Sequence, residues 1–428
     1  MISSTAIILI VIAILATVPA LIFKKKTNAE IHGPLCLWKT KKSLGIIEKL
    51  SEKEKLWRTI ADLGIVFSFG LISAIFLLYQ QKKKAGKIIL YYIVFLISSI
   101  AFIIIPSGAI GTSVSGIVTV ITGIGGFAFL ALLHQSGMII SDLLAGEAAM
   151  PGVAPVIPGV EVPGVPLQVP ISALIGLVIL LIVHEWGHGI VARVEGIAVK
   201  SVGLLTLGII PIGAFTEPDE EELEETSKKK RTRVYSIGSM NNFITAFAIG
   251  LVFLLPLQLF IAPGLQQQAI ENIEYWEVTE VPEESPFHGE LETGTKIYNI
   301  EEIYELEEPG QEITLETDKG EIDGKTDMYG SLGISVRQEE KGILGPGYFI
   351  KNHIIEIFTW IVLLNFLIGV INYLPFAIFD GARITEDIAG FYGEKAGIDS
   401  EKTGKIVSLI LTVIVTIMLI INVLPYFF

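Results

Sequence analysis

Cysteine is almost absent from the sequence, since Cys36 is the only one in 428 residues. A single cysteine excludes an internal disulfide and any metal site built from thiolates, so a bound metal would need nitrogen and oxygen ligands. Charge is also scarce, because charged residues make up 18% of the chain and hydrophobic residues 51%. Together with a mean hydropathy of +0.62, this composition predicts a membrane protein with several spans.

Long apolar runs are abundant, and each can cross a hydrocarbon core of about 30 Å. They lie near residues 5–23, 60–80, 87–105, 171–192, 234–262, 353–374 and 406–427. A further stretch, 109–145, is apolar but rich in glycine and serine, and its sequence is compatible with either a span or a re-entrant segment. The first run lacks a small-residue cleavage site and is followed by three lysines, so we expect it to remain as an anchor.

The net charge of −14 arises from one segment. Residues 266–352 hold 21 acidic and 6 basic residues, which predicts a small acidic domain that buries its own core. Its acidic surface excludes nucleic acid as a partner because it repels phosphate. The basic residues at 228–233 predict a cytoplasmic loop. Run 171–192 then passes inward through what is expected to be the plasma membrane, and the acidic domain is extracytoplasmic.

Two other basic segments, 24–59 and 82–84, also favour the cytoplasm. A single crossing by run 60–80 would place them on opposite sides of the membrane. The orientation of the first three runs therefore stays open.

Two segments near the middle of the chain are poor helix formers. Residues 151–170 contain six prolines, and interior prolines break helices, so this stretch is either an extended connector or a lid. Residues 200–216 combine glycines with valine, isoleucine, leucine and phenylalanine, which favours a strand.

One apolar run contains three polar side chains in the pattern HEWGH. His184 and His188 are four residues apart, so on a helix they differ by about 40° and share one face. Two imidazoles placed in this way can bind one zinc ion, and Glu185 beside them can take a proton from metal-activated water. The alternative is a chance pattern or interfacial histidines. It is disfavoured because a carboxylate deep in a membrane helix costs at least about 2.5–3.5 kcal/mol.

A zinc site built on two histidines needs a third ligand from elsewhere. Asp380 is the candidate, because Pro375 breaks the helix before it and lets the carboxylate project sideways. Taken alone, Asp380 is better explained as a cap or turn residue, since Asp-Gly is a common turn dipeptide. With the HEWGH helix in the same chain, the ligand interpretation is favoured.

These motifs resemble the site-2 protease family of intramembrane zinc metalloproteases, peptidase family M50. HEWGH is followed far downstream by N-x2-P-x4-D-G at Asn372 to Gly381, and the resemblance covers about residues 147–428. It implies that His184, His188 and Asp380 bind one Zn²⁺ and that Glu185 is the general base.

Two asparagines are further candidates. GSMNN at 238–242 is similar to the family's G-P-x-x-N element, with Ser239 in place of the proline. Asn242 and Asn372 can then position the substrate backbone or polarise the scissile carbonyl. The alternative is ordinary hydrogen bonding between helices.

Members of this family often carry a PDZ domain outside the membrane. Residues 285–303 and 328–336 resemble parts of such a domain, and a generic small α/β insert is the alternative. We therefore expect an α-helical polytopic membrane protein with a site-2 protease core, a membrane-associated β-strand segment and a PDZ-like insert. Its expected parts are an N-terminal transmembrane region of unknown function with a basic loop (1–146), the first part of the core (147–265), the insert (266–352) and the second part of the core (353–428).

The resemblance implies regulated intramembrane proteolysis, in which peptide bonds in or near transmembrane segments of membrane proteins are hydrolysed at a site toward the cytoplasmic side. A peptide or a substrate ectodomain is the expected partner of the insert. A transmembrane metal transporter is one alternative, but transport favours several sites along a path and His134 is the one other intramembrane candidate. A catalytically inactive scaffold is disfavoured because all four expected residues are present.

Overall fold

The computed structural model describes residues 29–427 except 33–34, 105–111, 154–158, 160–168, 208–209, 265–269, 271, 305, 307 and 341–349. The apolar run at 5–23 and most of the proline-rich segment 151–170 lie outside the described residues. The chain divides into two compact units, one made of Met1–Ile249 and Trp360–Phe428 and the other of Gly250–Thr359.

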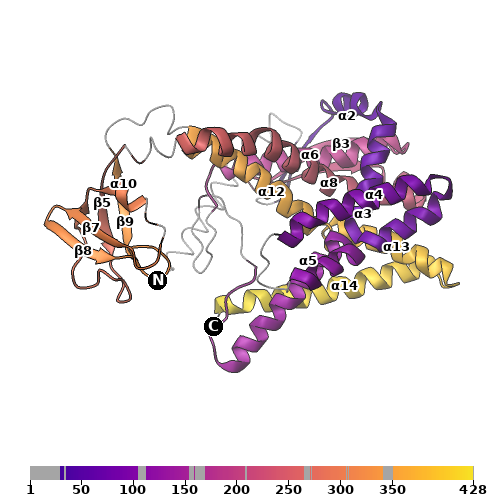
Figure 1. Cartoon of the computed structure of the whole chain (residues 1–428). Helices are drawn as coiled ribbons and strands as arrows, with labels where there is room; N and C mark the ends of the chain where they lie inside the picture. Colours follow the sequence, from indigo (N-terminus) through magenta and orange to yellow (C-terminus); the bar gives the residue numbers. More distant parts are fainter. Residues whose placement is uncertain are drawn as a thin grey trace, which may run out of the picture. The chain divides into compact units, whose positions relative to one another are not determined.

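The first unit is mainly helical, as the composition predicted (Figure 1). Its helices are α2 (Leu44–Ser51), α3 (Glu54–Gln80), α4 (Ala85–Ile104), α5 (Thr112–Ala145), α6 (Ala173–Val194), α7 (Glu220–Glu225), α8 (Lys228–Ile249), most of α12 (Glu356–Asn372), α13 (Asp380–Lys395) and α14 (Ser400–Val423). In the described part of the chain, 6 helical segments are long and apolar enough to cross a membrane, which supports a multi-pass membrane protein.

Helix α3 folds back on itself. Nineteen residues of straight helix would separate Asp62 and Gln81 by about 28 Å, yet Gln81 Nε2 donates to Asp62 Oδ2 at 3.2 Å. The bend lies at Phe69 and Gly70, whose backbone angles are not helical. Although α3 is long enough to span, its second half therefore returns toward its first half, and Gln81 lies beside Asp62. This geometry is compatible with the basic segments 24–59 and 82–84 lying on one side of a membrane.

The bend in α3 touches a second bend in α5. Gly70 has a φ of 55° and Gly123 a φ of 68°. A Cβ on Gly123 would lie 2.4 Å from the backbone nitrogen of Gly70, so the backbones of the two helices are in direct contact. Both positions require glycine for conformation and for space. The glycine-rich stretch 109–145 thus contains one kinked helix.

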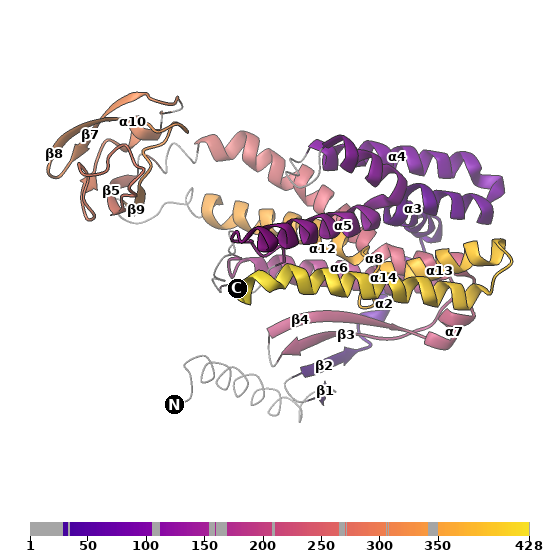
Figure 2. The same cartoon turned by 90° about the horizontal axis from the view of Figure 1, so that it is seen from below.

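A four-stranded antiparallel sheet, in the order β1-β2-β3-β4, lies beside these helices (Figure 2). Its strands are β1 (Ala29–His32), β2 (Leu35–Thr40), β3 (Val199–Leu207) and β4 (Ile210–Pro218). The strand predicted at 200–216 is confirmed, although it forms two strands. Residues 24–59, predicted as a basic hydrophilic loop, contain regular structure that was not predicted, because they supply β1, β2 and α2. The reason is long-range pairing of β2 with β3, which local polarity does not reveal.

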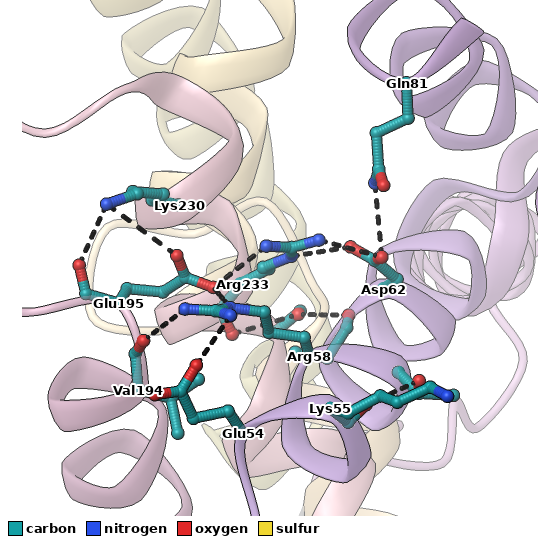
Figure 3. A network of polar contacts seen from close by, with 12 residues as sticks. Glu54, Lys55, Arg58, Asp62, Gln81, Val194, Glu195, Lys230 and Arg233 are labelled. Atoms are coloured by element: carbon teal, nitrogen blue, oxygen red, sulfur yellow. Dashed lines mark hydrogen bonds and ion pairs between the residues drawn. The ribbon is translucent and has the colours of Figure 1, made fainter. Parts of the chain in front are cut away.

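A buried charge network joins α3 to the end of α6 and the start of α8 (Figure 3). Arg233 donates to Asp62 through Nε at 2.7 Å and Nη2 at 2.9 Å, and to Glu195 through Nη1 at 2.8 Å. Arg58 binds the same oxygen of Glu195 at 3.1 Å. Asp62, Glu195 and Arg233 are each no more than 5% exposed. The network holds the N-terminal part of α3 close to the N-terminal part of α8, and both parts are rich in basic residues.

The end of α6 is sharply defined, because Gly196 adopts a φ of 87° after the last turn. Gly196 N donates to Arg193 O and Ile197 N to Ala192 O, the paired bonds of a glycine-terminated helix. This turn leads the chain directly into β3 and holds Glu195 inside the network.

The second unit contains a five-stranded antiparallel sheet in the order β8-β7-β6-β5-β9. Its strands are β5 (Ile273–Glu280), β6 (Lys296–Ile297), β7 (Glu312–Thr317), β8 (Gly320–Lys325) and β9 (Ser335–Glu340), with the short helix α10 (Ile300–Tyr304). Val278, Ile297 and Leu315 are fully buried in its core. The acidic segment therefore folds around its own core, while its assignment as a PDZ-like domain stays a prediction.

Candidate metal centre

The two histidines of HEWGH lie on one face of α6, as their spacing predicted. Their ring centroids are 4.8 Å apart. His188 Nδ1 lies 2.6 Å from the carbonyl oxygen of Val234 in α8. A carbonyl oxygen only accepts hydrogen bonds, so Nδ1 carries the proton and a neutral His188 presents a lone pair at Nε2. This backbone contact fixes the tautomer that a metal ligand needs.

Asp380 reaches the same place from the far end of the sequence. Helix α12 ends at Asn372, and Asp380 is the first residue of α13. Its Oδ2 lies 3.3 Å from Nε2 of His184 and 3.3 Å from Nε2 of His188. In the described part of the chain, these three residues form the one group of three or more potential metal ligands, with ligand atoms within 4.8 Å of one another.

The donor set fits a metal ion. Asp380 Oδ2 is buried and makes no hydrogen bond among the described residues. Nε2 of both histidines therefore faces a carboxylate oxygen that lacks a hydrogen bond, and leaving such a buried carboxylate uncompensated is unfavourable unless a cation lies between them. A metal ion satisfies all three atoms at once, and zinc accepts this combination of ligands.

Gly238 of α8 keeps the space beside the histidines open. A Cβ at this position would lie 2.5 Å from Nε2 of His188 and 2.7 Å from Nε2 of His184. Any side chain would thus occupy the place where the metal ligands converge. The sequence offered one signal for this role, the position of Gly238 at the start of GSMNN.

Glu185 is held by the sheet. Thr216 N in β4 donates to Glu185 Oε2 at 2.8 Å, and Thr216 Oγ1 donates to the backbone oxygen of Glu185 at 2.6 Å. The pair of bonds fixes both the carboxylate and the helix turn that carries it. The role of Thr216 was not predicted, because no sequence motif joins it to HEWGH.

A model of peptidase family M50 matches residues 172–420. The chain belongs to peptidase family M50. It is similar to an uncharacterised protein of Methanocaldococcus jannaschii, with 28% identity over 300 residues that cover 67% of this chain and 73% of that protein. It is also similar to a membrane-bound transcription factor site-2 protease homolog of Arabidopsis thaliana, with 27% identity over 184 residues that cover 43% of this chain and 34% of that protein.

Membership of family M50 confirms the resemblance seen in the motifs and, with the apolar helices, identifies a membrane peptidase. The family match begins at residue 172. Helices α2 to α5 and strands β1 and β2 therefore precede the matched region, although they pack against it.

The two candidate asparagines of this M50 peptidase occupy different places. Asn242 is fully buried, and its Nδ2 lies 3.2 Å from Nδ1 of His184. It therefore contacts a candidate ligand. Asn372 is half-buried at the end of α12, and among the described residues no hydrogen bond joins it to the metal centre.

Proposed function

We propose that this M50 peptidase is an intramembrane zinc metalloprotease that hydrolyses peptide bonds in or near transmembrane segments of membrane proteins. One observation carries the proposal, which is the convergence of His184, His188 and Asp380 on a space that Gly238 leaves open. Three protein ligands with a further position for water or substrate are typical of catalytic zinc.

Glu185 acts as the general base. A zinc ion held by His184, His188 and Asp380 would supply a water whose pKa is lowered to about 7 and a positive charge near the scissile carbonyl. Thr216 N–H holds Glu185 Oε2, and no hydrogen bond reaches Oε1 in the described part of the chain. Oε1 is therefore the atom that takes the proton from water and passes it to the departing amine.

The substrate binds as an extended segment along β4. A transmembrane helix hides its peptide bonds in internal hydrogen bonds, so it must unwind before cleavage. Strand β4 ends the four-stranded sheet, and its Thr216 is bonded to Glu185. A strand added to this edge would pass beside the general base. Crosslinks from a trapped substrate are expected within residues 200–216, and their complete absence there would contradict this binding mode.

The metal centre lies toward the cytoplasmic side of a plasma membrane, with the acidic insert outside. Support comes from the fold-back of α3 and from the Arg233 network, which bring the basic segments to one side as the distribution of lysine and arginine in membrane proteins requires. Single cysteines at Ser227 and Lys319 test the sidedness, because Cys36 is buried. An impermeant maleimide added outside intact cells is expected to label position 319 and spare position 227. The reverse pattern contradicts this topology.

The insert binds an extended peptide or a substrate ectodomain as a PDZ-like domain. A cavity of about 570 Å³ lies in it, with Tyr304 of α10 and Val336 of β9 among its lining residues. Strand β9 ends its sheet, so a peptide can pair with it. Binding of random C-terminal peptides to the full chain tests this role, and Val336→Lys is expected to abolish it.

Zinc-dependent cleavage of a model transmembrane substrate in detergent tests the activity. Glu185→Gln is expected to abolish cleavage while metal content stays equal to that of the wild type. Glu221→Gln, an exposed change on α7, is the matched control and should leave cleavage unchanged. Undiminished activity of Glu185→Gln with zinc bound would overturn the assignment.

A metal transporter fits the described residues less well. Transport favours several ligand clusters along a path, whereas the described part of the chain holds one. His134 on α5 belongs to no such cluster.

A further inference from the structure

A cavity of about 420 Å³ lies beside Glu185, between α6 and the four-stranded sheet. We call it the Glu185 cavity. Its lining includes Trp38, Lys39, Glu185, Leu204, Ala214 and Phe215. Most of the lining side chains are apolar, and three of them are aromatic. The cavity therefore offers an apolar environment next to the general base.

Trp38 lines one side of this cavity, although it lies outside residues 172–420, which match family M50. It lies on β2, where it pairs with Leu204 of β3. Its indole nitrogen donates to Thr206 Oγ1 at 2.7 Å, which fixes the orientation of the ring. The N-terminal part of the chain thus shapes the space beside the catalytic helix.

The charged groups at the cavity already have partners. Lys39 Nζ lies 3.3 Å from Glu30 Oε1 and 3.8 Å from Glu217 Oε1. Glu185 accepts a hydrogen bond from Thr216 N. Lys39 is therefore not a free counter-charge for an anionic ligand, which would lose its hydration on entry.

Small residues set the depth of the cavity. A Cβ on Gly203 would lie 2.4 Å from Cζ of Phe215 and 2.5 Å from the backbone oxygen of Trp38. The ring of Phe215 therefore lies directly over the backbone of β3. Ala214, the residue before Phe215 in β4, lines the cavity with a single methyl group.

We propose that the Glu185 cavity receives one large apolar side chain of the substrate, next to the cleaved bond, and that Trp38 sets its size. The inference rests on the proposed protease function. A volume of about 420 Å³ falls within the roughly 300–1,000 Å³ typical of ligand pockets, so a whole leucine or phenylalanine side chain fits. Such residues are plentiful in transmembrane segments, and a strand added along β4 would direct one of its side chains here.

Binding is tested without cleavage. A model transmembrane substrate carries p-benzoylphenylalanine, itself a large apolar side chain, at successive single positions, and Glu185→Gln prevents its consumption. One position is expected to crosslink to Trp38, Leu204 or Phe215. Ala214→Leu fills the cavity and should lower the yield at that position by at least roughly tenfold, the order of one misplaced methylene group. Crosslinks that avoid the cavity, or a yield unchanged by Ala214→Leu, overturn the proposal.

Specificity is tested with the active protein. The ratio of kcat/KM for leucine over alanine at the crosslinked position is expected to fall roughly tenfold in Trp38→Ala. Trp57→Ala is the matched control, because Trp57 donates to Leu50 O and does not line the cavity. An equal ratio in Trp38→Ala and the wild type contradicts the pocket. Cavity crosslinks in a zinc-loaded protein that cleaves nothing would contradict the protease function while supporting the pocket.

Discussion

Asn242 and His184 form a buried contact behind the metal centre, with 3.2 Å between Nδ2 and Nδ1. Oδ1 of the same amide is buried without a hydrogen-bond partner among the described residues. A histidine that binds metal through Nε2 keeps its proton on Nδ1 and needs an acceptor there. A 180° rotation of the Asn242 side-chain amide exchanges the positions of Oδ1 and Nδ2. After this rotation Oδ1 accepts a hydrogen bond from Nδ1 of His184, so we expect this orientation in the zinc-loaded protein.

Replacing this acceptor should weaken zinc binding. Asn242→Leu is expected to lower zinc affinity by about 10–100-fold, the usual effect of losing a hydrogen-bond partner behind a ligand. Asn242→Asp keeps an acceptor at this position. Its zinc affinity should therefore be at least that of the wild type, unlike the affinity of Asn242→Leu. Competition with a zinc chelator measures both, and equal affinity of Asn242→Leu and the wild type would rule out the positioning role.

Gly238→Ala should remove the metal without requiring global unfolding. Its Cβ would lie 2.5 Å from Nε2 of His188, inside the space where the ligands converge. Zinc content is expected to fall to background. Gly137→Ala on α5 is the matched control, since nothing lies within 4 Å of its added Cβ. Full zinc occupancy in Gly238→Ala would contradict the location of the metal.

Arg233→Met should destabilise the protein strongly, because Asp62 and Glu195 would remain buried as partly uncompensated carboxylates. The expected loss in the free energy of unfolding is about 3–5 kcal/mol. Arg337→Met removes an ion pair whose arginine side chain is 65% exposed, and about 0–1 kcal/mol is expected there. Unfolding in mixed micelles measures both variants, and losses of equal size would show that burial does not govern the Arg233 network.

Gly70→Ala should disturb the fold-back of α3. The position combines a φ of 55° with a space in which a Cβ would lie 2.7 Å from the backbone nitrogen of Gly123. With a ψ of −124°, this backbone conformation lies outside the regions allowed for residues with a Cβ, and such a conformation costs about 1–3 kcal/mol. Gly86→Ala on α4, where nothing lies within 4 Å of the added Cβ, should not destabilise. A melting temperature equal to that of the wild type in Gly70→Ala would contradict the bend.

Local patterns predicted which three side chains converge at the candidate metal centre, but they did not predict the long-range contacts of the fold. The four-residue spacing of His184 and His188 follows from helix periodicity, and Pro375 correctly indicated that the helix ends before Asp380. By contrast, the fold-back of α3 depends on Gly70 within an apolar run. A glycine within such a run is equally compatible with a straight membrane-spanning helix, so the sequence does not indicate the bend. The pairing of β2 with β3 joins segments about 170 residues apart, and no local periodicity specifies that register.

The position of β2 makes the first part of the chain a component of the peptidase rather than an appendage. Ile47 of α2 is fully buried in one cluster with Ile190 and Val191 of α6, and Trp38 lines one side of the Glu185 cavity. A truncated protein that begins at residue 172, where the family match begins, would keep every candidate ligand. It would lose the part of β2 that lines one side of the Glu185 cavity. Its catalytic helix would then expose apolar surface that the intact chain covers.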